Sequence, residues 1–171
     1  MKLFRRKAKM PADRRPALEP DERILAWAES SGGGDVVATN RGLWLPGLAR
    51  LGWHEIHKAV WSGRELTVTP AAVVAEQSGY AVVADQPLLS YLLLEPDDVP
   101  HQVRARVTRS VAYTEHHLLP DGGGVRVVAR RVSGVDGLTW TVRYDEGTAP
   151  DEAAVDDLVA AARETAGALS P

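Results

Sequence analysis

The sequence predicts an α+β fold: an antiparallel β-barrel or bent sheet, an added three-stranded meander and a C-terminal amphipathic helix. Residues 22–107 read as about seven short apolar strands separated by turn residues, followed by a helix. Residues 111–144 then return to strand periodicity, and apolar side chains recur at helical spacing from Val155 to Leu169. A chain of 171 residues that is 44% hydrophobic is long enough to bury a core.

The strands of the first part follow from short apolar runs bounded by glycine, serine and asparagine. Asn40-Arg41-Gly42 separates two such runs, and its end residues tolerate the positive φ that a tight hairpin needs. We expect strands over residues 24–28, 35–39, 43–45, 59–61, 65–69, 80–84 and 90–94.

A helix is expected after residue 95, because Glu95-Pro96-Asp97-Asp98 places carboxylates where free helical N–H groups favour them. Val99, Val103 and Val107 then recur every four residues and predict a narrow apolar stripe. Apolar and polar residues alternate near 111–113, 125–130 and 138–144, and a glycine-containing turn separates each of these segments from the next. This pattern predicts a three-stranded antiparallel meander.

The C-terminal helix has the clearest start signal, because Thr148-Ala149-Pro150-Asp151 fits a capping box with proline in the first turn. Four carboxylates fall in its N-terminal half. We also expect the five tryptophans to anchor the core: Trp27, Trp44, Trp53, Trp61 and Trp140.

The net charge of −3 conceals a strong segregation of charge along the chain. Residues 1–15 carry seven bases and one acid, whereas residues 145–171 carry one base and seven acids. Residues 99–144 carry seven arginines and three acids. We therefore divide the chain into a flexible basic arm (1–20), a barrel with its helix (21–107), and a meander with the C-terminal helix (108–171), the last two packed on one core.

Three stretches of the first part carry a family resemblance. These are Glu22-Arg23-Ile24-Leu25, the hairpin Val37-Ala38-Thr39-Asn40-Arg41-Gly42-Leu43-Trp44, and Leu51-Gly52-Trp53-His54-Glu55-Ile56. Together with the strand order, they resemble the bacterial PH-like and GRAM-like barrel modules over residues 22–107. The chain also looks like uncharacterised actinobacterial proteins with a late Trp-Thr-Val-x-Tyr-Asp-Glu-Gly. The resemblance implies a barrel fold, and its bearing on function is analogy between folds.

Several classes of chemistry are excluded or disfavoured. The chain has no cysteine, so it has no disulfide, thiolate metal site or thiol nucleophile. His54-Glu55-Ile56-His57 spaces its histidines three apart in a strand-rich context, unlike the zinc-protease motif, and His116-His117 point to opposite faces of a strand. The glycine triplets at 32–34 and 122–124 lack phosphate-loop or dinucleotide-binding contexts. We predict no catalytic set, no metal site and no cofactor.

The first candidate site is the basic arm. Its residues combine several positive charges with two apolar side chains, which suits reversible contact with an anionic membrane, while the alternative is a solvated tail. The arm residues are Lys2, Leu3, Phe4, Arg5, Arg6, Lys7 and Lys9.

The second candidate site is a group of arginines after residue 100. Arg126 and Arg130 lie four apart in a strand and therefore share a face, which could bind phosphate groups. The alternative is pairing with the acidic C-terminal helix. Nucleic acid is disfavoured, because exposed stacking aromatics are not interleaved with these arginines. The set is Arg104, Arg106, Arg109, Arg126, Arg130, Arg131 and Arg143.

Taken together, these patterns predict a non-enzymatic binding or adaptor module. We expect it in the cytoplasm, with the arm as a possible contact to the inner membrane face, because the apolar run 88–94 is far too short to span a bilayer. The partner is then an unknown protein or an anionic membrane surface. Two alternatives stay open: phospholigand or nucleic-acid binding through the arginines, and an enzyme whose polar residues are dispersed along the chain.

Overall fold

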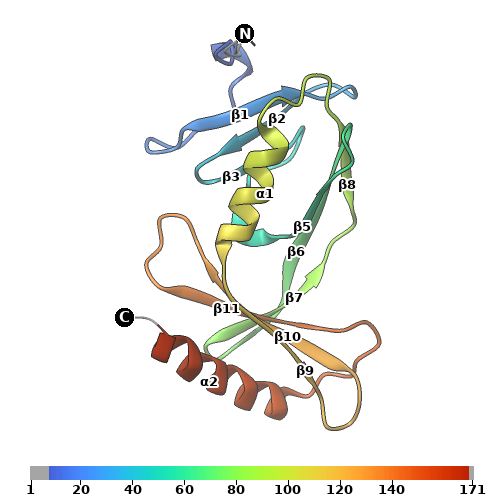
Figure 1. The fold of residues 1–171 in the computed structure, drawn as a ribbon, viewed down its shortest axis with the longest axis vertical. Coiled ribbons are helices and arrows are strands. Elements are labelled where there is room, and N and C mark those ends of the chain that lie inside the picture. The colour runs from blue at the N-terminus through green and yellow to red at the C-terminus, as the bar shows by residue number, and fades with distance from the viewer. Residues whose placement is uncertain (1–7, 170–171) are drawn as a thin grey trace, which may run out of the picture.

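The structure is a computed structural model that describes residues 8–169, and it confirms the α+β class. Figure 1 shows an elongated molecule with strands along its whole length, one helix across its upper half and one at its lower end. Within the described residues the α-helices are α1 (Val99–Ser110) and α2 (Glu152–Leu169). No helix in this part of the chain is long and apolar enough to cross a membrane.

The first sheet is curled and contains four antiparallel strands in the order β1-β2-β3-β4. Asp35–Thr39 forms β2 with the bounds the sequence predicted, and its apolar residues are buried. A short 3-10 helix, η2 (Trp53–Glu55), leads from this sheet to the next strand. The other three strands are β1 (Ile24–Glu29), β3 (Gly42–Trp44) and β4 (Leu51–Gly52).

The second sheet has seven strands, and its long strand β6 connects the two halves of the molecule. The first half of β6 pairs with β5 and β8, whereas the part after Pro70 pairs with β7. Proline has no N–H to donate to a ladder, which suits a point where a strand changes partners. The bounds are β5 (Ile56–Trp61), β6 (Glu65–Gln77), β7 (Tyr80–Asp85) and β8 (Leu89–Leu92).

The expected three-stranded meander is present and extends the second sheet. Its middle strand, β10 (Gly124–Arg131), pairs antiparallel with β9 (Val111–Leu118) and β11 (Leu138–Tyr144). β11 in turn pairs with β7 in parallel, a contact that the sequence did not predict. The order of the paired strands is β5-β6-β7-β11-β10-β9, so the meander and β5–β7 form one continuous sheet; the two sheets do not close into the expected barrel.

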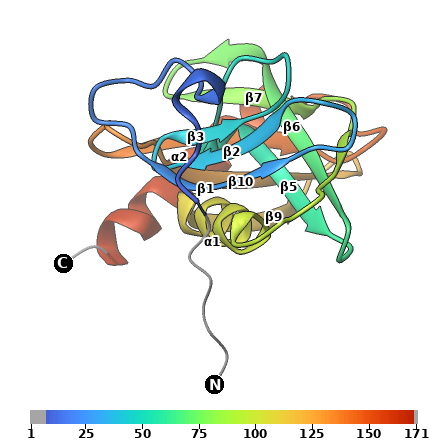
Figure 2. The same ribbon diagram turned by 90° about the horizontal axis from the view of Figure 1, so that it is seen from above.

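The two helices cover different parts of this framework. Val99 and Val103 of α1 are buried against the first sheet and β5, and Figure 2 shows α1 end-on beside β1, so that it runs along the length of the molecule. Val155, Val159 and Ala162 of α2 are buried against β10 and β11. The side-chain cap of α2 is Asp151, whose Oδ1 accepts the Ala154 N–H at 3.1 Å.

Two sequence expectations are wrong in detail. The predicted capping residue of α2 was Thr148, but its hydroxyl accepts the Gly124 N–H instead and so joins the helix entry to β10. The tryptophans do not all anchor the core: Trp53 and Trp140 are buried, while Trp27 and Trp44 are half-exposed beside Arg14 and Arg50 respectively.

Buried hydrophobic side chains form two clusters, where the sequence suggested one shared core. The first lies between the first sheet, β5, β6 and α1 and includes Trp53, Ile56 and Leu66. The second lies between the meander and α2 and includes Trp140 and Val142. The space between the two clusters is where polar side chains can meet.

Glu22, which directly precedes β1, is the polar anchor of the first sheet. Its side chain is fully buried, and Oε1 accepts hydrogen bonds from Thr39 Oγ1 (2.7 Å) and Trp44 Nε1 (3.0 Å). Oε2 accepts the Glu19 N–H and pairs with Arg50 at 2.6 Å. Burial alone would raise the pKa of Glu22, but these donors together lower it.

Residues 8–20 are attached to the first sheet rather than extended from it. Met10 is buried, and the 3-10 helix η1 (Ala12–Arg14) ends on Arg14, which pairs with Asp35 at 2.5 Å. Arg15 donates to the Met10 carbonyl. The predicted flexible arm of residues 1–20 therefore differs from the structure over residues 8–20.

Candidate anion-binding site

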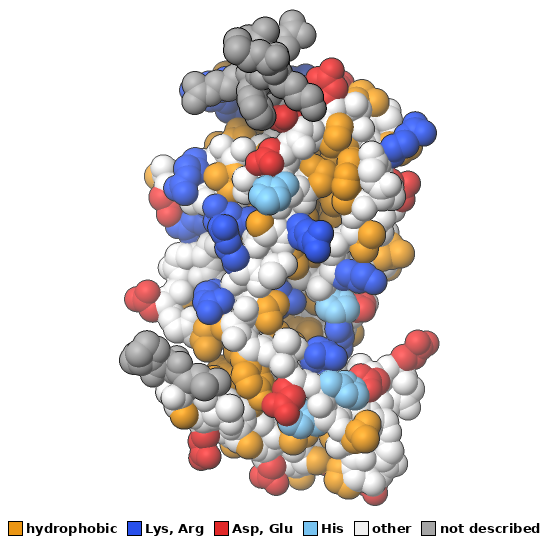
Figure 3. Space-filling model, viewed as in Figure 1, with side chains coloured by type: hydrophobic (Ala, Val, Ile, Leu, Met, Phe, Trp, Pro, Cys, Tyr) orange, Lys and Arg blue, Asp and Glu red, His pale blue; other side chains and the backbone are white. Residues whose placement is uncertain are grey.

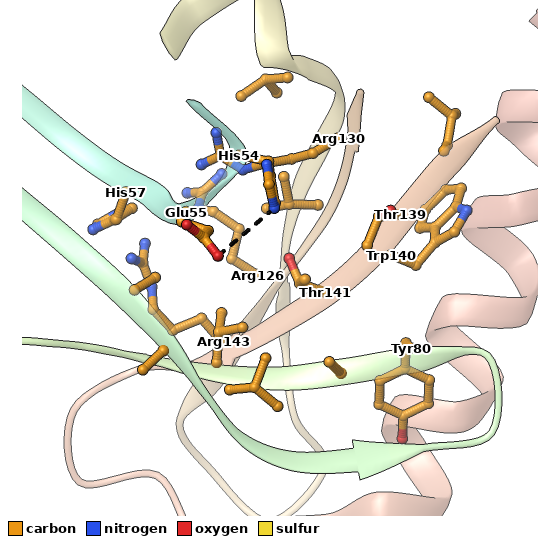
Figure 4. A pocket seen from close by; sticks show the side chains of 18 of the residues that line it. His54, Glu55, His57, Tyr80, Arg126, Arg130, Thr139, Trp140, Thr141 and Arg143 are labelled. Carbon is orange, nitrogen blue, oxygen red and sulfur yellow. Dashed lines mark ion pairs between the residues drawn. The ribbon is translucent and has the colours of Figure 1, made fainter. Parts of the chain in front are cut away.

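A groove of about 970 Å³ separates the two hydrophobic clusters. One wall is the segment η2–β5 and the floor is the face of the second sheet turned away from α2. Figure 4 shows arginine side chains that extend from the floor strands toward η2 and β5, which carry His54, Glu55 and His57. A volume of this size suits a small-molecule ligand.

Strand alternation explains why arginines reach this floor. On β10, Val125, Val127 and Ala129 are buried toward α2, so Arg126 and Arg130 point to the opposite face. On β11, Arg143 lies directly across from Arg126, and Thr139 across from Arg130. The floor of the groove therefore carries arginines from both strands and threonines from β11, with Val128 opposite Thr141 between them.

Arg130 is the most buried of these arginines, with 8% of its surface exposed. Its Nη1 donates to Ser110 Oγ at 2.7 Å, and no carboxylate of residues 8–169 lies within ion-pair distance of its guanidinium. Burial and the nearby Arg143 lower the pKa of Arg130. An arginine nevertheless keeps its charge in proteins, so the groove contains a buried positive charge with a neutral partner.

Arg126 and Arg143 differ in how their charge is balanced. Arg126 donates to the Thr114 hydroxyl at 3.1 Å, again a neutral partner. Arg143 pairs with Asp85 Oδ1 at 2.8 Å, and His57 Nδ1 lies 3.1 Å from the same oxygen. One carboxylate therefore contacts both an arginine and a histidine, and it balances the charge of Arg143.

The two histidines on the wall face this positive charge. Burial lowers the pKa of His57, and Arg143 and Arg130 lower it further, against the opposing effect of Asp85. Burial also lowers the pKa of His54, which Glu55 raises and Arg130 lowers. Both imidazoles are therefore neutral at pH 7 and can donate or accept a hydrogen bond.

The other arginines of the predicted set lie outside the groove. Arg104 and Arg109 are exposed on α1, and Arg106 is half-buried near Arg109, with its pKa lowered by burial and by neighbouring arginines. Arg131 is exposed and donates to the Arg109 and Val111 carbonyls at the end of α1. The structure thus brings three of the seven together: Arg126, Arg130 and Arg143.

The alternative interpretation, pairing of these arginines with the acidic C-terminal helix, does not hold within residues 8–169. No ion pair joins a carboxylate of α2 to any of the seven, and Asp156 instead accepts the Tyr80 hydroxyl. The helix α2 packs on the other face of the sheet, and none of its carboxylates lines the groove. Figure 3 shows acidic side chains around the lower end of the molecule and basic ones across its middle.

The remaining candidate residues are dispersed. His116 pairs with Asp145 at 2.7 Å outside the groove, and His101 is exposed on α1. No group of three or more potential metal ligands occurs within residues 8–169. Of the basic arm, Lys9 is exposed, and the residues Lys2, Leu3, Phe4, Arg5, Arg6 and Lys7 lie outside the described residues.

Sequence reasoning missed several residues that contribute to the groove. Thr139 and Thr141 alternate with buried residues of β11, a signal visible in the sequence. Arg163 lines the groove from within the acidic helix, where it donates to the Gly79 carbonyl and lies 5.9 Å from the Trp140 ring centroid. Its position depends on the docking of α2, which no local pattern reveals.

Comparison with known proteins gives no match: no family model, no curated protein and no solved structure is significantly similar to this chain. The function therefore has to be argued from the groove itself.

Proposed function

We propose that this protein is a binding module for a small anionic ligand, of which a phosphate group is the best-fitting example. The observation that carries the proposal is Arg130, a buried guanidinium that lines the groove with a hydroxyl as its partner. Burying a charge without a counter-ion costs several kcal/mol, so such a residue is retained where an anion compensates it. Arg126 adds a second guanidinium that has a neutral partner.

Phosphate suits the donors around it. Guanidinium groups bind phosphate oxygens through paired N–H donors, and neutral histidines and threonine hydroxyls can complete the coordination. Arg143, Thr139 and Thr141 line the same groove as the two uncompensated arginines. A recessed groove favours a small ligand over a nucleic-acid strand, which requires an accessible basic surface with stacking aromatics.

Calorimetric titration with inorganic phosphate, in a buffer free of phosphate and sulfate, tests the proposal. Replacing Arg130 with glutamine should weaken binding about tenfold or more, because a charge-assisted hydrogen bond to an anion contributes about 1.5–3 kcal/mol. The matched control is Arg131→Gln, which removes the same charge from the adjacent, exposed position. Equal affinity of the wild type and Arg130→Gln, or no binding by either, would overturn the proposal.

The proposed module acts by binding and not by catalysis. One wall of the groove carries His54 and Glu55, and His54 Nε2 lies 4.0 Å from Glu55 Oε1. These side chains can contact a bound ligand. The PH-like assignment belongs to the same proposal, and it is supported by a curled sheet followed by strands and the helix α1. An experimental structure in which β1–β8 and α1 superpose on a PH-like barrel would test it.

The basic arm supports a second, separate proposal of reversible contact with anionic membranes in the cytoplasm. Its charge composition carries this proposal, and each lysine or arginine near such a surface contributes about 1 kcal/mol. Sedimentation with phosphatidylserine vesicles compares the full chain with a truncation that lacks residues 1–7. Equal binding by both would show that the arm has no such role.

A further inference from the structure

The floor of the groove has two chemically different halves. The register places Ala81 of β7 beside Thr141 of β11, and Val83 follows two residues later on the same face as Arg143. Across β7, Val73 of β6 pairs with Val83. The β10–β11 half therefore presents three arginines and two threonines around Val128, and the β6–β7 half presents alanine and valine, with Glu76 and Gln77 at its far end.

The apolar half is open in the described structure. Val73 is 53% exposed although it is a large hydrophobic residue in the floor of the groove, and Val83 is half-buried beside it. Ala71, two residues before Val73 in β6, continues the same face toward Pro70. Neither α1 nor α2 contributes a hydrophobic side chain to this half, because their apolar faces belong to the two clusters.

The two halves lie side by side on one surface, so a single ligand can contact both. Arg143 and Val83 lie on adjacent strands, which are about 4.8 Å apart in a sheet. A ligand with its acid group on the arginines would therefore have its next atoms over alanine and valine. The groove is large enough for such a molecule, at about 970 Å³.

We propose that the natural ligand is an anionic amphiphile: a phosphomonoester whose phosphate lies on Arg126, Arg130 and Arg143 and whose hydrocarbon chain lies over Val73 and Val83. This inference rests on the proposed function, since it requires the arginine half to bind phosphate. It adds that binding energy comes from apolar contact with the β6–β7 half. The ligand is either a free phosphorylated molecule or the headgroup and first chain segment of a lipid.

Titration with a series of n-alkyl phosphates below their micelle concentrations tests the inference. Affinity should rise about fourfold for each methylene that becomes fully buried in the groove and then level off when the chain extends beyond β6. Inorganic phosphate provides the reference point. Val73→Thr should reduce the gain per methylene while leaving the affinity for inorganic phosphate unchanged.

The matched control is Val74→Thr, because Val74 is the adjacent residue, is 61% exposed and does not line the groove. Vesicles of phosphatidic acid distinguish the two sources of ligand. Vesicle binding that octyl phosphate displaces supports a lipid headgroup, and binding of octyl phosphate without vesicle binding supports a free molecule.

The outcomes separate this inference from the proposed function. If inorganic phosphate binds through Arg130 but affinity does not change with chain length, the amphiphile inference is wrong and the anion site stands. If neither inorganic nor alkyl phosphate binds, both are wrong. An equal loss in Val73→Thr and Val74→Thr would also overturn the inference.

Discussion

Replacing Arg130 with methionine should make the protein more stable in the absence of anions. Arg130 is 8% exposed and its guanidinium has a hydroxyl partner, so the folded state bears the cost of burying an uncompensated charge. Methionine fills a similar volume without that charge. Replacement of buried charged groups by apolar residues of similar size commonly stabilises proteins by about 1–4 kcal/mol.

The structure indicates a value in the lower part of that range. The substitution removes the hydrogen bond from Arg130 to Ser110, but Ser110 Oγ still donates to the Val107 carbonyl at 2.7 Å and is not left unsatisfied. The desolvation cost that the substitution removes, less the free energy of one lost hydrogen bond, gives an increase in unfolding free energy of about 1–2 kcal/mol. For a chain of this size the midpoint of thermal unfolding should rise by about 3–6 °C.

Thermal unfolding in a buffer without phosphate or sulfate measures this difference, with Arg131→Met as the control for loss of one surface charge. Addition of phosphate should then stabilise the wild type by mass action and leave Arg130→Met nearly unchanged. The difference in unfolding midpoint between the two proteins should therefore become smaller or change sign. If Arg130→Met is less stable than the wild type by more than about 1 kcal/mol without anions, the charge of Arg130 is already compensated by the fold and the reasoning fails.

Two further predictions concern the first sheet. Glu22→Gln should lose about 2–3 kcal/mol of unfolding free energy at pH 7, because Arg50 loses its buried counter-charge, whereas the exposed Glu29→Gln should lose under 0.5 kcal/mol. Folding lowers the pKa of Glu22, so the stabilisation that its carboxylate provides is present above the usual glutamate pKa of about 4.3 and is lost as pH falls through the lower, folded value. Urea unfolding between pH 7 and pH 3 should therefore show the difference in unfolding free energy between the wild type and Glu22→Gln becoming smaller. A gap independent of pH would contradict this assignment. Gly42→Ala should destabilise by about 2–4 kcal/mol, because its Cβ would lie 2.2 Å from the Leu51 carbonyl oxygen across β3–β4, and an unchanged urea midpoint would show that the edge strand can move away.

Local signals predicted most strands and both helices because each has its own periodicity or cap. The bounds of β2 follow from a run of apolar residues between turns, and α2 follows from an apolar face that begins at Val155. The sequence ended the fifth expected strand at residue 69, whereas β6 continues to Gln77. The Ala71–Val74 stretch has no alternation, because each half of β6 packs against different neighbours.

The candidate site was predictable only in part. Arg126 and Arg130 share a face by the period of a strand, and that pattern is local. The parallel pairing of β7 with β11 joins residues about 60 positions apart and places Val83 beside the arginines. No pattern in the chain encodes that contact, because it depends on the order in which strands enter the sheet.

The same geometry explains why the charge arithmetic of the sequence misled. The basic segment 99–144 and the acidic segment 145–171 have opposite net charge and are adjacent in the structure, yet the groove arginines and the helix α2 lie on opposite faces of the sheet. Val127 and Val142 face α2, so alternation turns Arg126 and Arg143 to the other side, where Asp85 is the acid that pairs with Arg143. The helix satisfies the apolar face of the sheet and leaves the positive face open. A positive charge that the fold buries but does not neutralise, as at Arg130, is the feature of this molecule on which the proposed anionic ligand rests.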